Sequence, residues 1–257
     1  MKAIDYVNGR YIKDLAANGS RVDGRGADDF RNVNVSKGVI NNAEGSAQVD
    51  LGDTRVLAGV KMVAEEPMAD TPDQGNLIVS AEMLPLADPE YEAGPPSPEA
   101  VELARVIDRG IRAAEMIDLH SLIIEEGKAW SVYLDLYVLN NDGNLFDAGM
   151  IAATNALMTT KVPEYRDGKA VMAERKKPLK VDNTVTSCTF AKVDGKTLLD
   201  PNSVEEKAAE VRLTVETDGK AIRAMQKGLS GSFTAEEIKG LIDVAFNKHP
   251  VLVKYLK

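Results

Sequence analysis

The spacing of apolar residues changes between two periods along the chain and predicts where helices and strands lie. Residues 4–15 carry apolar side chains at helical intervals and stop before Gly19, which predicts an N-terminal helix. Residues 44–63 alternate between apolar and polar positions on both sides of Gly52, and this pattern predicts two strands joined by a turn. Residues 76–86 predict one further strand.

The middle of the chain has the strongest helical pattern. Residues 98–117 are amphipathic, and Pro98 suits the first helical turn. Residues 130–142 read as a strand, and residues 145–160 read as a helix that is apolar on nearly every side. A helix of that composition is expected to be buried.

The second half repeats strands followed by a helix. Asp-Gly turns at 194–195 and 218–219 lie between strand-like arms and predict two hairpins. The last helix is expected to begin at Thr234, because Glu237 gives it capping-box spacing. The element order predicts an α+β fold with two stacked βα halves.

Three segments follow from this order. Residues 1–27 form an N-terminal helix and extension, 28–165 the first half, and 166–257 a linker with the second half. The charged residues 163–182 are the expected boundary between the halves.

Composition narrows the function classes. The chain has 44% hydrophobic residues, enough for a sizeable core, and no apolar run of the roughly 20 residues that a membrane span needs. The single cysteine, Cys188, excludes an internal disulfide, fits a reducing, cytoplasmic location, and lies in a strand-like segment that favours a core position. His120 and His249 lack metal-ligand spacing, so we expect no metal and no cofactor. The net charge of −9 disfavours nucleic acid as a ligand without excluding a local basic stripe.

One stretch raises the question of phosphate chemistry. Residues 140–149, NNDGNLFDAG, join the end of a strand to the start of a helix through a glycine turn. Proteins build phosphate sites from these parts, because the N–H groups of a helix N-terminus point at the anion.

Four stretches of the chain together resemble one family. SRVDGRGADDFRNV at 20–33, EGSAQVDLGDTRVLAGV at 44–60 and KVDGKTLLDPNSVEE at 192–206 resemble the RNase PH-like phosphorolytic exoribonucleases. Residues 72–112 are similar to the non-catalytic RNase PH-like subunit of archaeal exosomes. The resemblance implies the RNase PH fold and a hexameric ring, a trimer of heterodimers with a catalytic sister subunit. It also implies RNA-binding cap subunits and single-stranded RNA as the substrate of the assembly.

The glycine turn departs from the pattern of active relatives. There the turn reads Gly-Gly-Ser/Thr-Arg or close to it, and its hydroxyl and guanidinium hold the attacking phosphate. Here Gly143 is followed by Asn144, Leu145 and Phe146, so both the hydroxyl and the cation are missing. We interpret the turn as a degenerate phosphate site in which Leu145 and Phe146 anchor the helix by burial.

A second departure concerns an aspartate of active relatives that is suited to general-acid catalysis. A gapless count places its position at Asn183, with Asp182 one residue early and therefore on the other face of a strand. Whether Asp182 substitutes for it stays open. Asp200 matches a carboxylate common to active and inactive relatives, and we favour a structural role for it.

Three arginines recur on one face of the helix at 98–117. Arg105, Arg109 and Arg112 lie within about 60° of one another, opposite Leu103, Val106 and Ile107. By composition alone they form a solvated face with pairs such as Asp108 and Arg112. The resemblance favours RNA instead, because arginines at matching positions line the RNA path of the ring.

The remaining basic and aromatic residues have less specific interpretations. Arg21 and Arg25 either contact RNA or fix the packing of the N-terminal segment, and we favour packing. The basic run 174–180 is expected in a solvated loop, and Trp130 in the core or a subunit contact.

Together these observations predict a catalytically inactive subunit that pairs with an active sister, shapes its site and helps to hold RNA. One alternative is that the chain is itself a phosphate-dependent 3′–5′ exoribonuclease. Another is a pure scaffold without RNA contact.

Overall fold

The first half of the chain is built on a six-stranded sheet covered by two helices. In the computed structural model, which describes residues 3–256, with side chains at 9–175 and 177–256, the main strand order is β1-β2-β3-β6-β4 and β5 pairs with β6. Every pairing is antiparallel except that of β4 with β6. The strands are β1 (Val33–Lys37), β2 (Gly45–Leu51), β3 (Thr54–Glu65), β4 (Asn76–Met83), β5 (Ile123–Glu125) and β6 (Lys128–Asn140).

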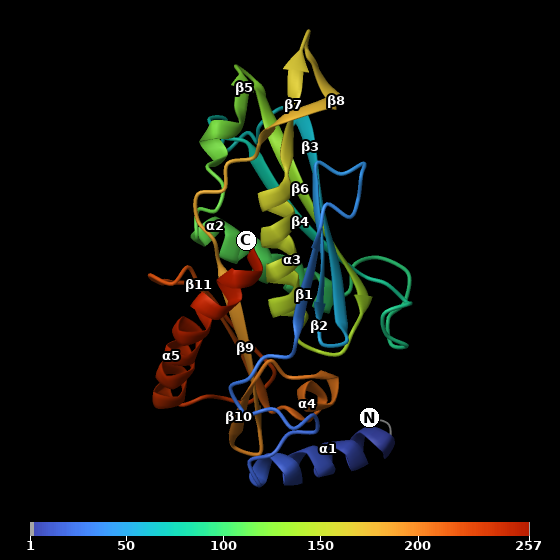
Figure 1. The fold of residues 1–257 in the computed structure, drawn as a ribbon, viewed down its shortest axis with the longest axis vertical. Coiled ribbons are helices and arrows are strands. Elements are labelled where there is room, and N and C mark those ends of the chain that lie inside the picture. The colour runs from blue at the N-terminus through green and yellow to red at the C-terminus, as the bar shows by residue number, and fades with distance from the viewer. Residues whose placement is uncertain (1–2, 257) are drawn as a thin grey trace.

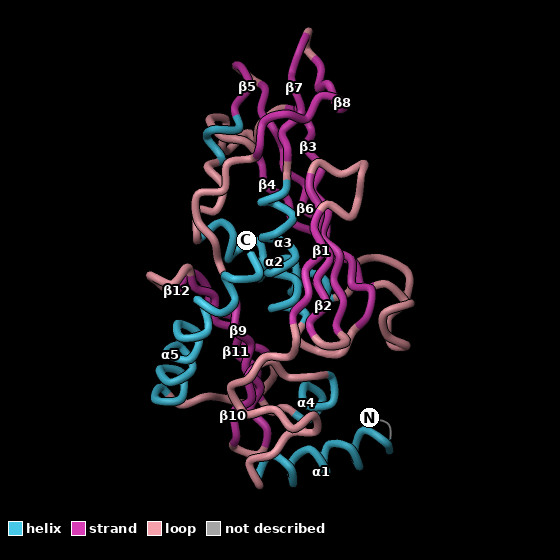
Figure 2. Tube along the Cα trace, in the orientation of Figure 1, coloured by secondary structure: helices cyan, strands magenta, loops and turns pink. Residues whose placement is uncertain are grey.

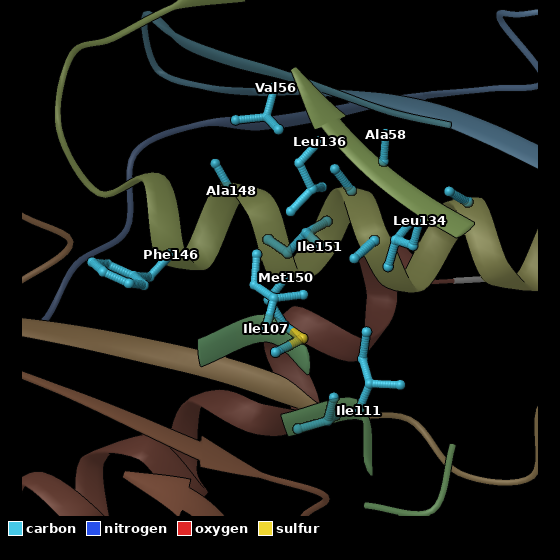
Figure 3. Packing of buried hydrophobic residues seen from close by; sticks show 14 of the residues in the cluster. Val56, Ala58, Ile107, Ile111, Leu134, Leu136, Phe146, Ala148, Met150 and Ile151 are labelled. Atoms are coloured by element: carbon cyan, nitrogen blue, oxygen red, sulfur yellow. The ribbon is translucent and has the colours of Figure 1, made fainter. Parts of the chain in front are cut away.

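Helix α3 (Leu145–Thr159) lies at the centre of the molecule, between β2 and β3 on one side and the second half on the other (Figure 1). Its apolar composition predicted burial, and twelve of its residues are buried, among them Met150 and Ile151 (Figure 3). Helix α2 (Pro98–Ala113) packs against α3 through Leu103 and Ile107, which approach Gly149 of α3. Pro98 is the first residue of α2, as the sequence predicted, and Ser97 caps the helix.

The second half is a four-stranded sheet with helices at its side and base (Figures 1 and 2). Its strand order is β10-β9-β11-β12, and the predicted hairpins turn at Asp194-Gly195 and Asp218-Gly219. The strands are β9 (Thr186–Val193), β10 (Lys196–Leu199), β11 (Val211–Thr217) and β12 (Ile222–Gly228), and the helices are α1 (Ala3–Ala17), α4 (Ser203–Ala208) and α5 (Ala235–Leu252). Thr234 and Glu237 form the predicted capping box of α5. The two stacked βα halves of an α+β fold are thus confirmed.

The prediction of a loop for the basic run 174–180 was wrong. Strand β8 (Lys169–Pro178) contains most of it and forms a hairpin with β7 (Lys161–Arg166) around Asp167-Gly168. Both turn residues have positive φ, as an Asp-Gly hairpin turn requires. Arg175 is also not merely solvated, because it donates to the carbonyl oxygen of Ala43 and pairs with Glu44.

One main hydrophobic cluster joins both halves. It includes Trp130 and Cys188, as expected for core positions, and burial raises the pKa of the Cys188 thiol. No helix within residues 3–256 is long and apolar enough to cross a membrane. Short helices at Leu119–Leu122 (η1) and Val253–Leu256 (η2) complete the described chain.

Candidate functional site: a closed phosphate turn and an exposed arginine face

The predicted glycine turn exists and starts α3, but an asparagine controls its conformation. Asn144 is fully buried and lies in the left-handed region, with φ 55° and ψ 49°. Its side chain accepts from the backbone N–H of Asp147 and donates to Asp147 Oδ2 at 2.8 Å. Asparagine tolerates this region better than most residues, so the turn needs no second glycine after Gly143.

The backbone donors of the turn bind groups of the chain itself. The N–H of Asn144 donates to Glu206 Oε1 on α4 at 3.0 Å, and the N–H of Gly143 donates to Asn141 Oδ1 at 3.1 Å. A Cβ at Gly143 would lie only 2.5 Å from the backbone carbon of Asn202, so the start of α4 packs directly against the turn. A carboxylate and an amide oxygen of the chain itself therefore accept from these two N–H groups, and the start of α4 packs against the turn.

Asp200 connects this turn to the N-terminal segment. It is fully buried, and its oxygens accept from Asn144 Nδ2 at 2.6 Å and from Arg31 Nε and Nη2 at 3.0 and 2.7 Å. Arg25 Nη1 donates to it at 3.0 Å. Burial alone would lower the pKa of Arg31, but the hydrogen bond and charge of Asp200 raise it above its ordinary value. Asp200 thus pairs with two arginines at once, and Asp23 and Asp142 provide each of them with a second carboxylate. These contacts account for the Asp200 carboxylate structurally.

Leu145 and Phe146 are the turn residues that were expected to anchor the helix by burial. Leu145 is half-buried and packs against the core, and Phe146 is 5% exposed. The guanidinium of Arg212 on β11 lies 4.3 Å above the centre of the Phe146 ring. At that distance a cation and an aromatic face attract each other. Phe146 therefore binds a cation of the protein itself.

Two carboxyl groups near the turn, the fully buried Asp147 and the half-buried Glu206, have pKa values raised by removal from water. Burial raises the pKa of Asp147 to about 6, although Asn144 and Thr189 donate to its carboxylate. Burial likewise raises the pKa of Glu206, against the opposing hydrogen bond from Asn144. The surroundings of the turn therefore disfavour additional negative charge.

The arginine face has the arrangement that the helical spacing predicted. Arg105, Arg109 and Arg112 are exposed on α2, while Leu103, Val106 and Ile107 are buried. The three arginines line a cavity of about 280 Å³ together with Asp108 and Ala113.

The three arginines differ in how they are held. Arg112 pairs with Asp108 at 2.9 Å, as the solvated-face interpretation predicted, and also donates to the carbonyl of Leu77. Arg109 Nη1 donates to the neutral side chain of Gln226 at 3.1 Å. Arg105 makes no ion pair or side-chain hydrogen bond with the residues that the structure describes. Within the described residues, two of the three guanidinium groups therefore have no paired carboxylate.

Arg21 and Arg25 contribute to internal packing, the role that the sequence favoured. Arg21 is 5% exposed and makes a two-point contact with Glu205, at 2.9 and 2.6 Å. Arg25 contacts Asp23 and Asp200. Both tie the segment before β1 to the region around α4.

Family models match most of the chain. Residues 29–163 match domain 1 of the 3′ exoribonuclease family (RNase PH), and residues 183–248 match domain 2. The chain belongs to the RNase PH family.

Single archaeal proteins resemble the chain over most of its length. The chain is 42% identical to "Exosome complex component Rrp42" of Methanothermobacter thermautotrophicus, over all of this chain and 96% of that protein. It is 46% identical to the protein of the same name from Methanopyrus kandleri, over 90% of this chain and 88% of that one. A chain in the structure described as the Archaeoglobus fulgidus exosome with RNA bound to the active site has a TM-score of 0.93 and 42% identity, with both chains fully covered.

The position expected for the general-acid aspartate of RNase PH enzymes does not lie at the turn. Asn183 precedes β9 and donates weakly to the carbonyl of Glu115, at 3.4 Å. With Asp182 and Arg112 it lines a separate cavity of about 570 Å³ beside α2. The residue of β9 that contacts the turn is Thr189, which binds Asp147. A missing carboxylate at Asn183 therefore carries no information about this turn.

Sequence reasoning missed Glu206 and the short helix α4 that places it. Asn202 and Glu205 form a capping box at the start of α4, and this Asn-x-x-Glu spacing was the available signal. Among the described residues, no group of three or more His, Cys, Asp or Glu is placed to hold a metal ion.

Proposed function

We propose that this chain is a non-catalytic subunit of an archaeal exosome, a 3′–5′ RNA-degrading ring. It pairs with a catalytic RNase PH-like sister in a trimer of heterodimers, helps to structure the sister's active site, and contributes to RNA binding. Cap subunits that bind RNA complete the assembly, and the ring acts in the cytoplasm.

The state of the glycine turn carries this proposal. The N–H groups of Gly143 and Asn144 bind Asn141 and Glu206, and the chain has no hydroxyl or guanidinium at Leu145 and Phe146. A phosphorolytic enzyme needs donors that await the attacking phosphate. The full-length likeness to proteins named as exosome components supports the assembly.

The purified chain alone is expected to release no nucleoside diphosphates from poly(A) RNA in the presence of phosphate. The same chain assembled with its sister should degrade the RNA in a phosphate-dependent manner. Gel filtration shows which assembly is present, and chromatography of the products measures the reaction. Phosphate-dependent release by the isolated chain would favour the alternative that it is itself an exoribonuclease.

The scaffold alternative is tested at the arginine face. Arg105 and Arg109 are one helical turn apart, so their guanidinium groups can reach the same or successive phosphates of one strand. Replacing both by glutamate should weaken RNA binding by the ring at least tenfold. It should also lower the salt slope, the rate at which the logarithm of the binding constant falls with the logarithm of the salt concentration. The expected decrease is roughly 1.4, about 0.7 for each lost phosphate contact. Filter binding across a salt series measures both effects.

The ring itself should survive this double substitution, because both side chains are exposed and the apolar face of α2 is untouched. The loss should be similar for RNA of different sequence, since phosphate contacts do not read bases. An intact ring that binds RNA like the parent at every salt concentration would leave the chain a scaffold.

A further inference from the structure

A chain of polar contacts links the exposed Arg109 to the degenerate turn. Arg109 Nη1 donates to Gln226 Oε1 at 3.1 Å, and Gln226 Nε2 donates to Glu102 Oε1 at 3.2 Å. Glu102 Oε2 in turn accepts from Arg212 Nη2 at 3.1 Å, and Arg212 lies on the Phe146 ring. The contacts cross from α2 to the edge strand β12 and end at the first turn of α3.

The carboxylate of Glu102 determines how the amide of Gln226 is oriented. A carboxylate only accepts hydrogen bonds, so the NH₂ group of Gln226 must face it. The amide oxygen then points to Arg109, which only donates. Every hydrogen bond in this series of contacts pairs a donor with an acceptor. The reverse orientation of the amide would place its oxygen against the Glu102 carboxylate and its NH₂ group against the Arg109 guanidinium.

The neutral amide holds Arg109 without neutralising it. The charge of Glu102 is matched by Arg212, whose side chain is only 17% exposed, while Gln226 separates Glu102 from Arg109. An amide adds no charge, so the guanidinium of Arg109 keeps its full attraction for an anion. Arg112 differs, because Asp108 contacts it directly.

Phe146 and Gly228 pack against the guanidinium of Arg212. The ring of Phe146 lies under its guanidinium, and a Cβ at Gly228 would come within 2.8 Å of its Nη2 atom. Arg212 Nε is buried and has no acceptor within the described chain. Phe146, at the turn position that the resemblance assigns to an arginine in active relatives, thus supports the guanidinium of Arg212. That guanidinium contacts Glu102 on α2.

We propose that Gln226 is a positioning residue that holds Arg109 for an RNA phosphate while leaving its charge free, supported by Glu102, Arg212 and Phe146. This inference rests on the proposed RNA-binding function. It assigns a role to a half-buried glutamine on β12, far from Arg109 in sequence, and gives the degenerate turn a purpose in RNA binding.

The test uses the assembled ring, fluorescent poly(A) RNA and phosphate-free buffer, so that binding is measured without degradation. Gln226→Ala should weaken binding roughly two- to tenfold, the value of one hydrogen bond, with an unchanged salt slope. Gln226→Glu should weaken binding and also lower the slope by roughly 0.7, because the new carboxylate neutralises Arg109. Gln48→Ala removes a half-buried glutamine from β2, in the other sheet, and should bind like the parent.

A double-mutant cycle separates this role from a general loss of structure. Arg109→Ala should lower the slope by roughly 0.7, and adding Gln226→Ala to it should cause no further loss. If Arg109→Ala weakens binding while both Gln226 variants bind like the parent, or if the two losses add, the positioning role is overturned. If Arg109→Ala itself binds like the parent, the RNA-binding role of Arg109 fails and the inference fails with it.

Discussion

Replacing Asp200 by asparagine is expected to lower the free energy of unfolding by about 3–5 kcal/mol, the typical cost of removing one partner of a buried ion pair. All the side-chain partners of Asp200 are donors, on Arg25, Arg31 and Asn144. An asparagine would turn an NH₂ group toward one of these donors and remove the buried charge between the two guanidinium groups. Arg25 and Arg31 would then keep only the partly exposed carboxylates of Asp23 and Asp142 as charged partners. The variant should also lose the packing of α4 against the turn.

Unfolding of the chain in a urea series, at one fixed protein concentration, measures this loss. Asp50→Asn is the matched control, because it breaks the pair between Asp50 and Arg55, whose side chain is 50% exposed. Exposed pairs contribute about 0–1 kcal/mol, so the control should unfold nearly like the parent. Equal midpoints for the Asp200 and Asp50 variants would show that Asp200 does not neutralise the buried arginines.

The helices and strands that the sequence predicted well are those whose signal is local. Helix α2 could be placed because its apolar face, its first-turn proline and its arginine face all lie within residues 98–113. The hairpin of β7 and β8 was missed although Asp167-Gly168 repeats the turn recognised at Asp194-Gly195, because charged arms obscure the alternation. Helix α4 has only six residues, too few to show a helical period.

The candidate site was predictable only in part, because some of its contacts join residues that are far apart in the sequence. The absence of a hydroxyl and a cation could be read from Leu145 and Phe146, since it concerns the residues themselves. What occupies the turn instead could not be read, because Glu206 and Asp200 lie roughly sixty residues further along the chain. Gapless counting placed a lost carboxylate at Asn183, and the structure places Asn183 beside α2 and not at the turn.

The same non-local contacts suggest how a phosphate site can be given a new use. Asp200 and Glu206 bind donors of the turn region, and Phe146 seats Arg212. We propose that Arg109 on the neighbouring helix supplies the positive charge for phosphate that the turn lacks. Loss of catalysis and gain of RNA contact would then be connected through Arg212.

Glu216 on β11 is expected to make the stability of this chain depend on pH. The residue is 1% exposed, and neither carboxyl oxygen has a hydrogen-bond partner within residues 3–256. The backbone of α2 at Gly110 approaches it so closely that a Cβ there would contact Glu216 Oε2. Burial raises the pKa of Glu216 from 4.5 to about 8, the charge of Asp147 adds to the rise, and Arg109 opposes it.

The direction of the effect follows from proton binding. Below about pH 4.5 both the folded and the unfolded chain carry the proton, and Glu216 does not affect the equilibrium. Between pH 4.5 and 8 the unfolded chain releases the proton while the folded chain keeps it, so stability falls as pH rises and levels off above pH 8. The contribution of Glu216 to this fall is about 3 kcal/mol between pH 5 and pH 8.

Glu216→Gln should therefore remove this part of the pH dependence, because the amide does not ionise. Relative to the parent, the variant should gain stability steadily from pH 5 to pH 8, by about 3 kcal/mol in total. Urea midpoints measured at each pH unit test this, and Glu126→Gln at an exposed position should run parallel to the parent throughout. If the Glu216→Gln and parent curves also stay parallel, Glu216 ionises in the folded chain as readily as in the unfolded one, and the interior around Gly110 must admit its charge.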